Sequence, residues 1–550
     1  MFNFDKFLKI KKDERKKVIL LSLFFFFSFL YFTLCDTIST SVFISRVGAG
    51  SLYYIYFIIS FLLAITALLI TKIIGSLNIF RVYRLFSAIT IIIHILNYLI
   101  LLFFADFPQI YFILPIATEI NYNFLWISAL LIAYSALDIE SIKRILPLAL
   151  ASGTLGAICA GAVLSLLSQF LNLETIYLIA LSTIFIMFYF STIIKKQLVV
   201  IPGESGDKIG LFSLLSYYKN NKFYIALIFI GILVISTFWM NDYQTNKAIE
   251  TLIPDERALS SFYGIFEILF NVFLITFEAL ILGRIIKKFG ALKIAYLVIF
   301  AITLGNIFIL SADNITTITI SKLIFAIFVA VISSEIFQFY YQPIETKYKN
   351  SIVVTAQFFI KSGALFVGGF FTLISSLDII KTKYLTLISL IISILLLILW
   401  IFMNKSFLKI IKHTIESLNP EKIKALSEID ISHFIYSNLN DEHFKIALGR
   451  NELVLDLVKY SDSDYKDKII QKIFDISDIS FKLKLIDCIF ENYFSYSYLK
   501  TIVELKSTKI TEYLVYAALL NKNNFKDKDL FLYILRTINE NNYKFENDSA

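Results

Sequence analysis

The chain contains 550 residues, of which 58% are hydrophobic and 17% are charged, and its net charge is +8. Soluble proteins are about 45–50% apolar and about 25% charged, so a soluble fold of this size cannot bury this much apolar surface. The 18 glycines and 7 prolines exclude collagen-like and low-complexity chains, and the spacing of the three cysteines indicates neither disulfides nor a metal site. The composition predicts an all-α membrane protein that crosses the bilayer repeatedly.

Hydrophobic runs of spanning length follow one another through residues 1–404. A helix needs about 20 apolar residues to cross about 30 Å of hydrocarbon, and twelve runs reach that length. The longest connection, about 195–221, divides them six and six. We therefore predict a first bundle at 1–194, a linker at 195–220 and a second bundle at 221–404. The expected spans are 18–38, 51–71, 85–105, 110–134, 145–170, 174–194, 221–241, 259–282, 290–311, 316–340, 351–376 and 384–404.

Basic residues gather in alternate connections between these spans. The N-terminal segment and the loops on its side hold most of them, whereas the opposite side has only Arg46, Lys247, Arg257, Lys381 and Lys383. Basic loops stay in the cytoplasm, so both termini are predicted to be cytoplasmic, in the inner membrane of a cell. Membrane orientation accounts for the excess of positive charge, and we expect no nucleic-acid partner.

Residues 405–550 differ in composition from the rest. They contain 21 basic and 22 acidic residues, a charge content typical of a soluble domain. Short amphipathic stretches such as 442–459 and 464–475 are separated by polar breaks. Stacked helix pairs fit this spacing and predict a cytoplasmic α-solenoid-like domain. Such a domain either binds a protein partner or simply stabilises the cytoplasmic face.

The two predicted bundles share a weak internal similarity. Ser152-Gly153 and Ser362-Gly363 lie 210 residues apart, and Arg46 and Arg257 are separated by nearly the same distance. Parallel six-helix repeats are the internal symmetry of major facilitator folds. The common offset therefore favours a 6+6 major facilitator arrangement.

Four segments resemble loops of the ATP/ADP translocase-like branch of the major facilitator transporters. They are DIESIKRILPLALASGTLGAICAG (138–161), DERALSSFYGIF (255–266), LGRIIKKFGALK (282–293) and YYQPIETKYKNS (340–351). The resemblance covers about residues 14–404 and implies a secondary transporter, with a nucleotide-related cargo as one class. Some bacterial members carry a cytoplasmic HEAT-type repeat domain, which residues 405–550 resemble.

Polar residues inside the expected spans are the candidates for a substrate or ion site. Charges are costly in hydrocarbon and usually face water or protein. The helical period places Glu119 and Asn123 on one face of 110–134, and Glu267 and Asn271 on one face of 259–282. Both faces are therefore predicted to border the transport path.

Lys361 is the sharpest single candidate. It lies about ten residues into its span, so about 15 Å deep, and Gln357 shares its face. A lysine near the midplane cannot easily reach the bilayer surface. We predict that it contacts a substrate or coupling ion together with Glu267 and Glu119, and a structural ion pair with one of these glutamates is the alternative.

Basic and acidic residues near the cytoplasmic ends of spans are gate candidates. Arg284, Lys287 and Lys288 form the basic part of LGRIIKKFGALK, which acts either as a latch between transport states or as a turn that sets topology. Glu335 lies near the cytoplasmic end of 316–340. It is predicted to be part of a gate, to contact a lipid headgroup or to contact the substrate.

Two further residues are weaker candidates. Lys322 is only about six residues into its span and is expected to snorkel to the outer surface. His94 fits a proton relay, but a histidine hydrogen-bonded between helices is the more frequent arrangement. Neither residue is therefore placed at the predicted site.

No motif for catalysis competes with transport. The sequence has no Walker loop, paired-histidine zinc motif or nucleophile elbow, and no cofactor is indicated. A nucleoside triphosphate needs several positive groups, whereas the interior offers mainly Lys361 against several glutamates, which argues against ATP/ADP exchange. The sequence predicts a secondary transporter of a polar or charged small molecule; the alternative is a non-transporting scaffold or sensor that presents the helical-repeat domain.

Overall fold

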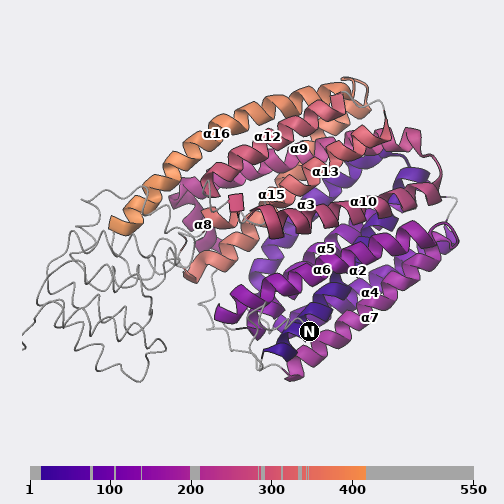
Figure 1. Cartoon of the computed structure of the whole chain (residues 1–550), viewed down its shortest axis with the longest axis horizontal. Helices are drawn as coiled ribbons and strands as arrows, with labels where there is room; N and C mark the ends of the chain where they lie inside the picture. Colours follow the sequence, from indigo (N-terminus) through magenta and orange to yellow (C-terminus); the bar gives the residue numbers. More distant parts are fainter. Residues whose placement is uncertain are drawn as a thin grey trace, which may run out of the picture. The chain divides into compact units, whose positions relative to one another are not determined.

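The computed structural model describes residues 14–416, except for short gaps at 75–78, 105–106, 138, 198–210, 283, 286–290, 311–313, 332–336, 342–343 and 345. The chain divides into two compact units, one of residues 1–338 and 350–405 and the other of residues 339–349 and 406–550. The described residues are almost entirely helical (Figure 1). Most of the predicted cytoplasmic domain at 405–550 lies outside the described residues, as do Lys287, Lys288 and Glu335.

Every expected span overlaps a helix of 17 residues or more in the described part of the chain. Shorter helical pieces stand between or at the ends of these helices: η1 (Ala49–Ser51), η2 (Pro108–Phe112), α8 (Leu211–Asn220), η3 (Phe277–Leu282) and α14 (Phe337–Tyr340). The long helices are α2 (Arg15–Arg46), α3 (Leu52–Ile74), α4 (Ile79–Phe103), α5 (Ile113–Ala136), α6 (Ile139–Leu167), α7 (Leu173–Gln197), α9 (Lys222–Leu252), α10 (Glu256–Thr276), α12 (Ala291–Leu310), α13 (Ile315–Val331), α15 (Thr346–Ser376) and α16 (Lys383–Glu416).

Nine of these helices are, over their described residues, long and apolar enough to cross a membrane. Two shorter apolar helices lie at Ala295–Leu310 and Ile315–Ala330. Large apolar side chains such as Phe103, Phe229 and Ile391 are more than half exposed, as expected for surfaces that face lipid. The protein is a multi-pass membrane protein, and crossings by α5, α12 and α13 stay a prediction.

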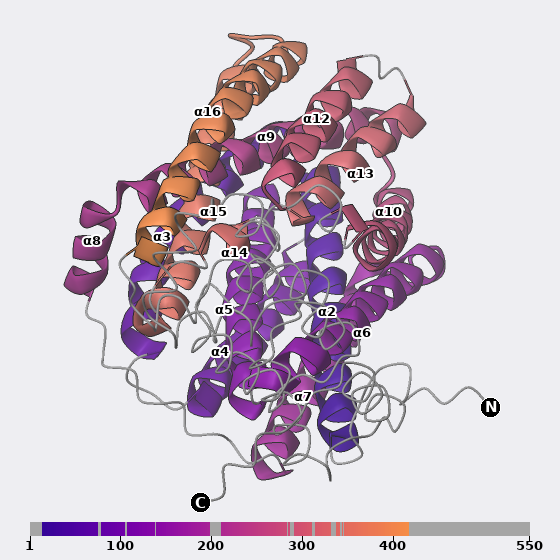
Figure 2. The same cartoon turned by 60° about the vertical axis from the view of Figure 1, so that its left-hand side comes forward.

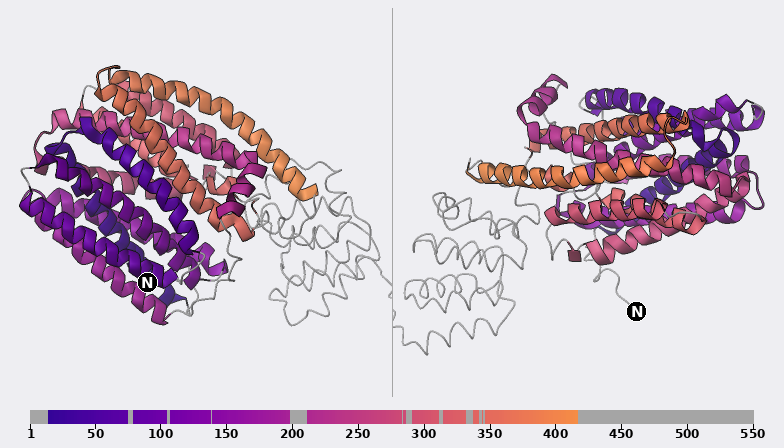
Figure 3. Two further views of the ribbon diagram at one scale, coloured as in Figure 1. Left: turned by 180° about the vertical axis from the view of Figure 1, so that it is seen from behind. Right: turned by 90° about the horizontal axis from the view of Figure 1, so that it is seen from above.

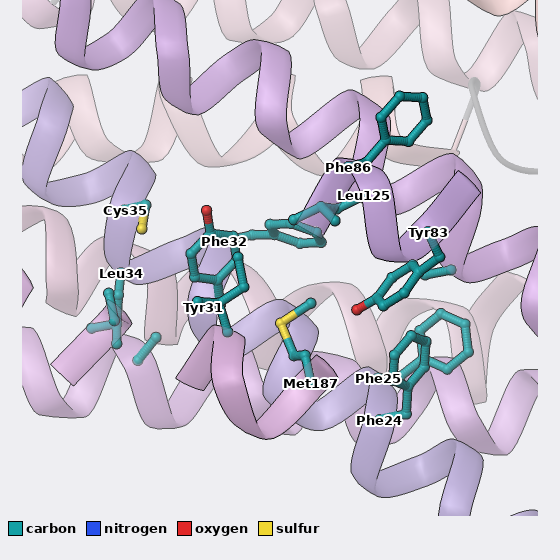
Figure 4. Packing of buried hydrophobic residues seen from close by; sticks show 14 of the residues in the cluster. Phe24, Phe25, Tyr31, Phe32, Leu34, Cys35, Tyr83, Phe86, Leu125 and Met187 are labelled. Atoms are coloured by element: carbon teal, nitrogen blue, oxygen red, sulfur yellow. The ribbon is translucent and has the colours of Figure 1, made fainter. Parts of the chain in front are cut away.

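The first half of the body, α2 to α7, is organised around α2. This helix packs against α5, α6 and α7, and α4 packs against α5 and α7. Phe24 and Phe25 are fully buried, and the Phe24 ring lies tilted against Tyr83 (Figure 4). The Phe25 ring meets Trp126 edge-on. Gly156 allows the closest approach, because a Cβ there would lie 2.1 Å from the carbonyl oxygen of Phe26 on α2. The small residues of span five therefore serve helix packing.

The second half, α9 to α16, is held together by side-chain hydrogen bonds as well as by apolar packing. Asn306 on α12 donates to Ser389 on α16 at 2.9 Å, and Gln244 on α9 donates to Thr386 on α16 at 2.8 Å. A Cβ at Gly231 on α9 would lie 2.8 Å from the Ile360 side chain on α15. Figures 1 and 3 show α9, α12, α13, α15 and α16 lying together.

The two halves meet along two helix pairs. On α6 and α10 the backbones touch, since a Cβ at Gly161 would lie 2.5 Å from the carbonyl oxygen of Gly264. On α3 and α15, the hydroxyls of Ser60 and Ser362 each donate to the other residue's carbonyl oxygen at 2.8 Å. These pairs join the first half to the second through close backbone packing and through hydrogen bonds.

Candidate functional site

The structure brings together two of the three residues predicted at the centre. Lys361 is the middle residue of α15, and its ammonium forms an ion pair with Glu119 on α5, in the other half. The Lys361 Nζ also lies 3.5 Å from the Asn123 Oδ1 and 5.3 Å from the centre of the Tyr122 ring. The side chains of Lys361 and Glu119 keep 24% and 16% of their accessible surface. The pair therefore joins the two halves, and neither side chain is fully enclosed by protein.

Glu267 lies near this pair but does not contact Lys361. Its carboxylate accepts a hydrogen bond from the Asn271 amide at 3.1 Å, and the same amide donates to the Glu267 carbonyl oxygen at 2.8 Å. Asn271 is 4% exposed. Glu267 interacts electrostatically with Lys322 on α13. Glu267 and Asn271 therefore lie on one face of α10, and the lysine that interacts with Glu267 electrostatically is Lys322, not Lys361.

Asp36 on α2 is a further carboxylate near these groups. It is exposed, whereas Cys35 and Thr37 beside it are buried. Its carboxylate interacts electrostatically with Glu119, Glu267 and Lys361. Helix α2 contacts both α5 and α10 and lies between them in Figure 2. We call Asp36, Glu119, Glu267 and Lys361 the central cluster.

A second lysine is buried in a network that the sequence analysis missed. Lys322 is 8% exposed, so its predicted snorkelling to the outer surface is wrong. Its Nζ forms an ion pair with Asp242 on α9 at 3.0 Å and donates to the Asn246 Oδ1 at 2.8 Å. Tyr263 also donates to Asn246, and Tyr56 on α3 donates to Asp242 at 3.0 Å. Lys322 turns inward because carboxylate and amide oxygens satisfy its ammonium there.

A third charged group lies at the C-terminal end of α2, around Arg46. Arg46 binds both carboxylate oxygens of Glu256 on α10, at 2.7 and 2.9 Å, and donates to the Tyr111 hydroxyl at 2.6 Å. The Ala49 amide donates to Glu250 at 3.1 Å, next to Gly48, whose φ of 100° suits glycine. These bonds tie the first half to the second.

The remaining predicted residues are placed less informatively. Gln357 is exposed on α15, one turn from Lys361, and Arg284 is exposed after η3. His94 is fully buried, and its two ring nitrogens hydrogen-bond with the hydroxyls of Tyr31 and Tyr177. It is therefore a histidine bonded between helices. The described residues contain no cluster of histidine, cysteine or carboxylate side chains suited to a metal ion.

Solved structures of transporters share this fold. The nucleoside transporter NupG aligns with a TM-score of 0.52 at 16% identity, over 70% of this chain and 99% of that chain. The POT family transporter PepTSo aligns with a TM-score of 0.55 at 13% identity, over 71% and 98%. An auto-inhibited POT family peptide transporter gives 0.52 at 11% identity, over 71% and 96%. No family model matches the sequence, and no curated protein matches it. The described body has the fold of major facilitator-type transporters.

Proposed function

We propose that this protein is a secondary transporter that moves a polar or charged small molecule by alternating access. The carrying observation is the Lys361–Glu119 pair, which joins a helix of one half to a helix of the other and stays partly exposed. An ion pair in this position can open and close as the halves rock against each other. A scaffold that had lost its cargo would instead be expected to keep these charges dry and fully paired.

The central residues have distinct roles in this proposal. Lys361 and Glu119 exchange their mutual contact for contacts with the substrate or a coupling ion, and Asn123 keeps Glu119 oriented through its 2.9 Å hydrogen bond. Glu267, Asn271 and the exposed Gln357 line the same path. Since the sequence contains no Walker loop, the energy comes from an ion gradient or from exchange.

The known neighbours favour a polar cargo. NupG is a nucleoside transporter, and one neighbour of the POT family is a peptide transporter. Nucleosides and peptides both carry several hydrogen-bonding groups, which matches the carboxylate and amide groups in the present centre. We also propose that the chain belongs to the ATP/ADP translocase-like branch by fold. The proposal does not extend to ATP/ADP exchange.

The membrane arrangement completes the proposal. Twelve crossings in the order 6+6, with both termini cytoplasmic in the inner membrane, follow from the alternation of basic loops. Arg284, Lys287, Lys288 and Glu335 would then lie at the cytoplasmic side as gate residues. Residues 405–550 would form a helical-repeat domain there that binds a protein partner.

Transport is tested with purified protein in two steps. A panel of metabolites is screened for those that raise the melting temperature, because a ligand that binds the folded state stabilises it. Hits are then tested for uptake into proteoliposomes. We expect Lys361→Ala to abolish uptake while the protein still melts cooperatively, and Lys381→Ala, at an exposed lysine, to leave uptake unchanged. Normal uptake by Lys361→Ala would remove Lys361 from the site.

A collapse of the Lys361→Ala melting temperature would need a second variant. The structure identifies Glu119 as the partner, so the matched rescue is Glu119→Gln in the Lys361→Ala background. Recovery of stability in the double variant without recovery of uptake fits transport, because both residues serve the cargo. Recovery of both would make the pair purely structural, and the substrate site would then lie elsewhere in the protein.

A further inference from the structure

The same short motif occurs twice in the centre of the molecule. Glu119 and Asn123 on α5 are four residues apart, as are Glu267 and Asn271 on α10. In each case the asparagine amide donates both to the backbone carbonyl and to the carboxylate of its glutamate, at 2.6 and 2.9 Å on α5 and at 2.8 and 3.1 Å on α10. Since the amide nitrogen is used in the same way, each motif presents a carboxylate and an amide oxygen as acceptors.

One of these motifs has an ammonium bound to it. The Lys361 Nζ pairs with the Glu119 carboxylate and lies 3.5 Å from the Asn123 Oδ1. The aromatic ring of Tyr122 adds a cation–π contact at 5.3 Å. A tethered primary ammonium is therefore the occupant of the motif on α5.

The motif on α10 has no such occupant among the described residues. Glu267 forms no ion pair within 4 Å there, and within these residues the buried Asn271 side chain hydrogen-bonds to Glu267 alone, through its amide nitrogen. Lys322 interacts electrostatically with Glu267, but its ammonium is held by Asp242 and Asn246 at 3.0 and 2.8 Å. The chemistry that binds Lys361 is thus repeated without its lysine.

The balance of charge points the same way. Lys361 neutralises Glu119 and Lys322 neutralises Asp242, whereas Asp36 and Glu267 have no ion-pair partner in the part of the chain that the structure describes. Asp36 is exposed and interacts electrostatically with Glu267. Two carboxylates in one region favour a positively charged ligand over an anion.

We propose that Glu267 and Asn271 bind the ammonium group of an organic cation, with Asp36 supplying the second negative charge, and that this amine is the substrate. The inference rests on the proposed transport function and names its substrate class. The Lys361 ammonium occupies the motif on α5 in the same way that the ligand's ammonium would occupy the motif on α10.

The chemistry of the motif is tested first, without any transport assay. Lys361→Ala removes the tethered ammonium from Glu119 and Asn123, so propylammonium should raise the melting temperature of this variant more than that of the unmodified protein. Propanol and sodium chloride at equal concentration control for the alkyl chain and for ionic strength. Adding Glu119→Gln should remove the rescue. Equal shifts with propylammonium and sodium chloride would overturn the inference that the motif binds ammonium.

The second test addresses the motif on α10 directly. Radiolabelled putrescine and tyramine are the probes, and diacetylputrescine and 4-ethylphenol are their counterparts without a charged amine. We expect an amine probe to bind the full-length protein, and Glu267→Gln to weaken that binding about tenfold or more, because it removes a charged hydrogen-bond acceptor. Glu278→Gln, which neutralises an exposed carboxylate eleven residues further along the chain, should leave the affinity unchanged.

The outcomes separate this inference from the transport function. If the protein binds and moves neutral or anionic metabolites but no amine, the inference is overturned and the transport function stands. If the amine binds at Glu267 but is not taken up into proteoliposomes that contain the protein, the binding site stands and the transport function fails. If Glu267→Gln and Glu278→Gln weaken amine binding equally, the assignment to Glu267 is overturned.

Discussion

The two lysine–carboxylate pairs of this protein are alike in chemistry and different in surroundings. Lys361 on α15 pairs with Glu119 in the first half, and the two side chains keep 24% and 16% of their accessible surface. Lys322 pairs with Asp242 within the second half and is enclosed by Asn246, Tyr263 and further aromatic contacts. In the proposed transport function the first pair spans a boundary that moves, whereas the second joins α9 to α13. The difference teaches that the location of a charge relative to the two halves indicates its role better than its depth does.

The largest effect is expected where the buried pair is broken on one side. Asp242→Ala leaves the Lys322 ammonium buried without its carboxylate, which costs about 3–5 kcal/mol. We expect a strong loss of folded protein and of melting temperature in detergent. Asp242→Asn combined with Lys322→Met should recover most of the stability, since no charge is then left unpaired. An Asp242→Ala protein with an unchanged melting temperature would contradict the structural role of this pair.

A buried network within the first half gives the next largest effect. His94 joins α4 to α2 and α7 through the hydroxyls of Tyr31 and Tyr177, and all three side chains are buried. His94→Leu leaves two buried hydroxyls without this partner, at about 1–3 kcal/mol each. Thermal unfolding should show a clear loss of stability, while amine or metabolite affinity stays unchanged. A loss of affinity without a loss of stability would instead place His94 in the transport path.

The sequence predicted the helices and singled out Lys361, Glu119 and Glu267 as candidates because those features depend on local patterns. Apolar runs of spanning length predicted a helix at each expected place. The helical period placed Glu119 and Asn123 on one helix face, and Glu267 and Asn271 on another. Lys361 was found because a lysine in the middle of an apolar run is unusual. Its choice between Glu119 and Glu267 depends on how the two halves meet, which no local pattern contains.

The missed network shows the limit of hydropathy. The seventh span was expected to end at 241, where the apolar run gives way to polar residues, but α9 continues to Leu252. Asp242 and Asn246 therefore fell outside the predicted span although both are in a packed helix. Their spacing of four residues is the one feature that indicated a shared face. The environment of Lys322 was missed for a second reason: its partners lie about 80 residues away in the sequence.

A smaller effect on stability is expected at the pair between the halves. Lys361→Ala leaves Glu119 with its Asn123 hydrogen bond and with part of its surface accessible, so we expect a loss of about 1 kcal/mol, as for partly exposed pairs. The same substitution should abolish uptake. Comparing its melting temperature with that of Asp242→Ala measures the difference between the two pairs directly, and equal losses would contradict it.

The smallest change in stability is expected at Arg46, where the effect should fall on conformation. The Arg46 and Glu256 side chains are 23% and 25% exposed, so Arg46→Gln should cost at most about 1 kcal/mol. The lost bidentate pair nevertheless links α2 of one half to α10 of the other, and its geometry holds only when this end is closed. Removing it should shift the population towards states that are open here.

Spin labels at the exposed residues Phe107 in the first half and Leu377 in the second would report this opening. We expect the distance distribution of Arg46→Gln to extend to longer values. Arg257→Gln, which removes a single hydrogen bond to Asn172 at 2.7 Å, should have a weaker effect in the same direction. Lys381→Gln, at an exposed residue without an ion pair in the described part of the chain, is the control and should change nothing. A distribution that is the same in all three variants would mean that the contacts between Glu250 and the Ala49 amide, and not Arg46, keep this end closed.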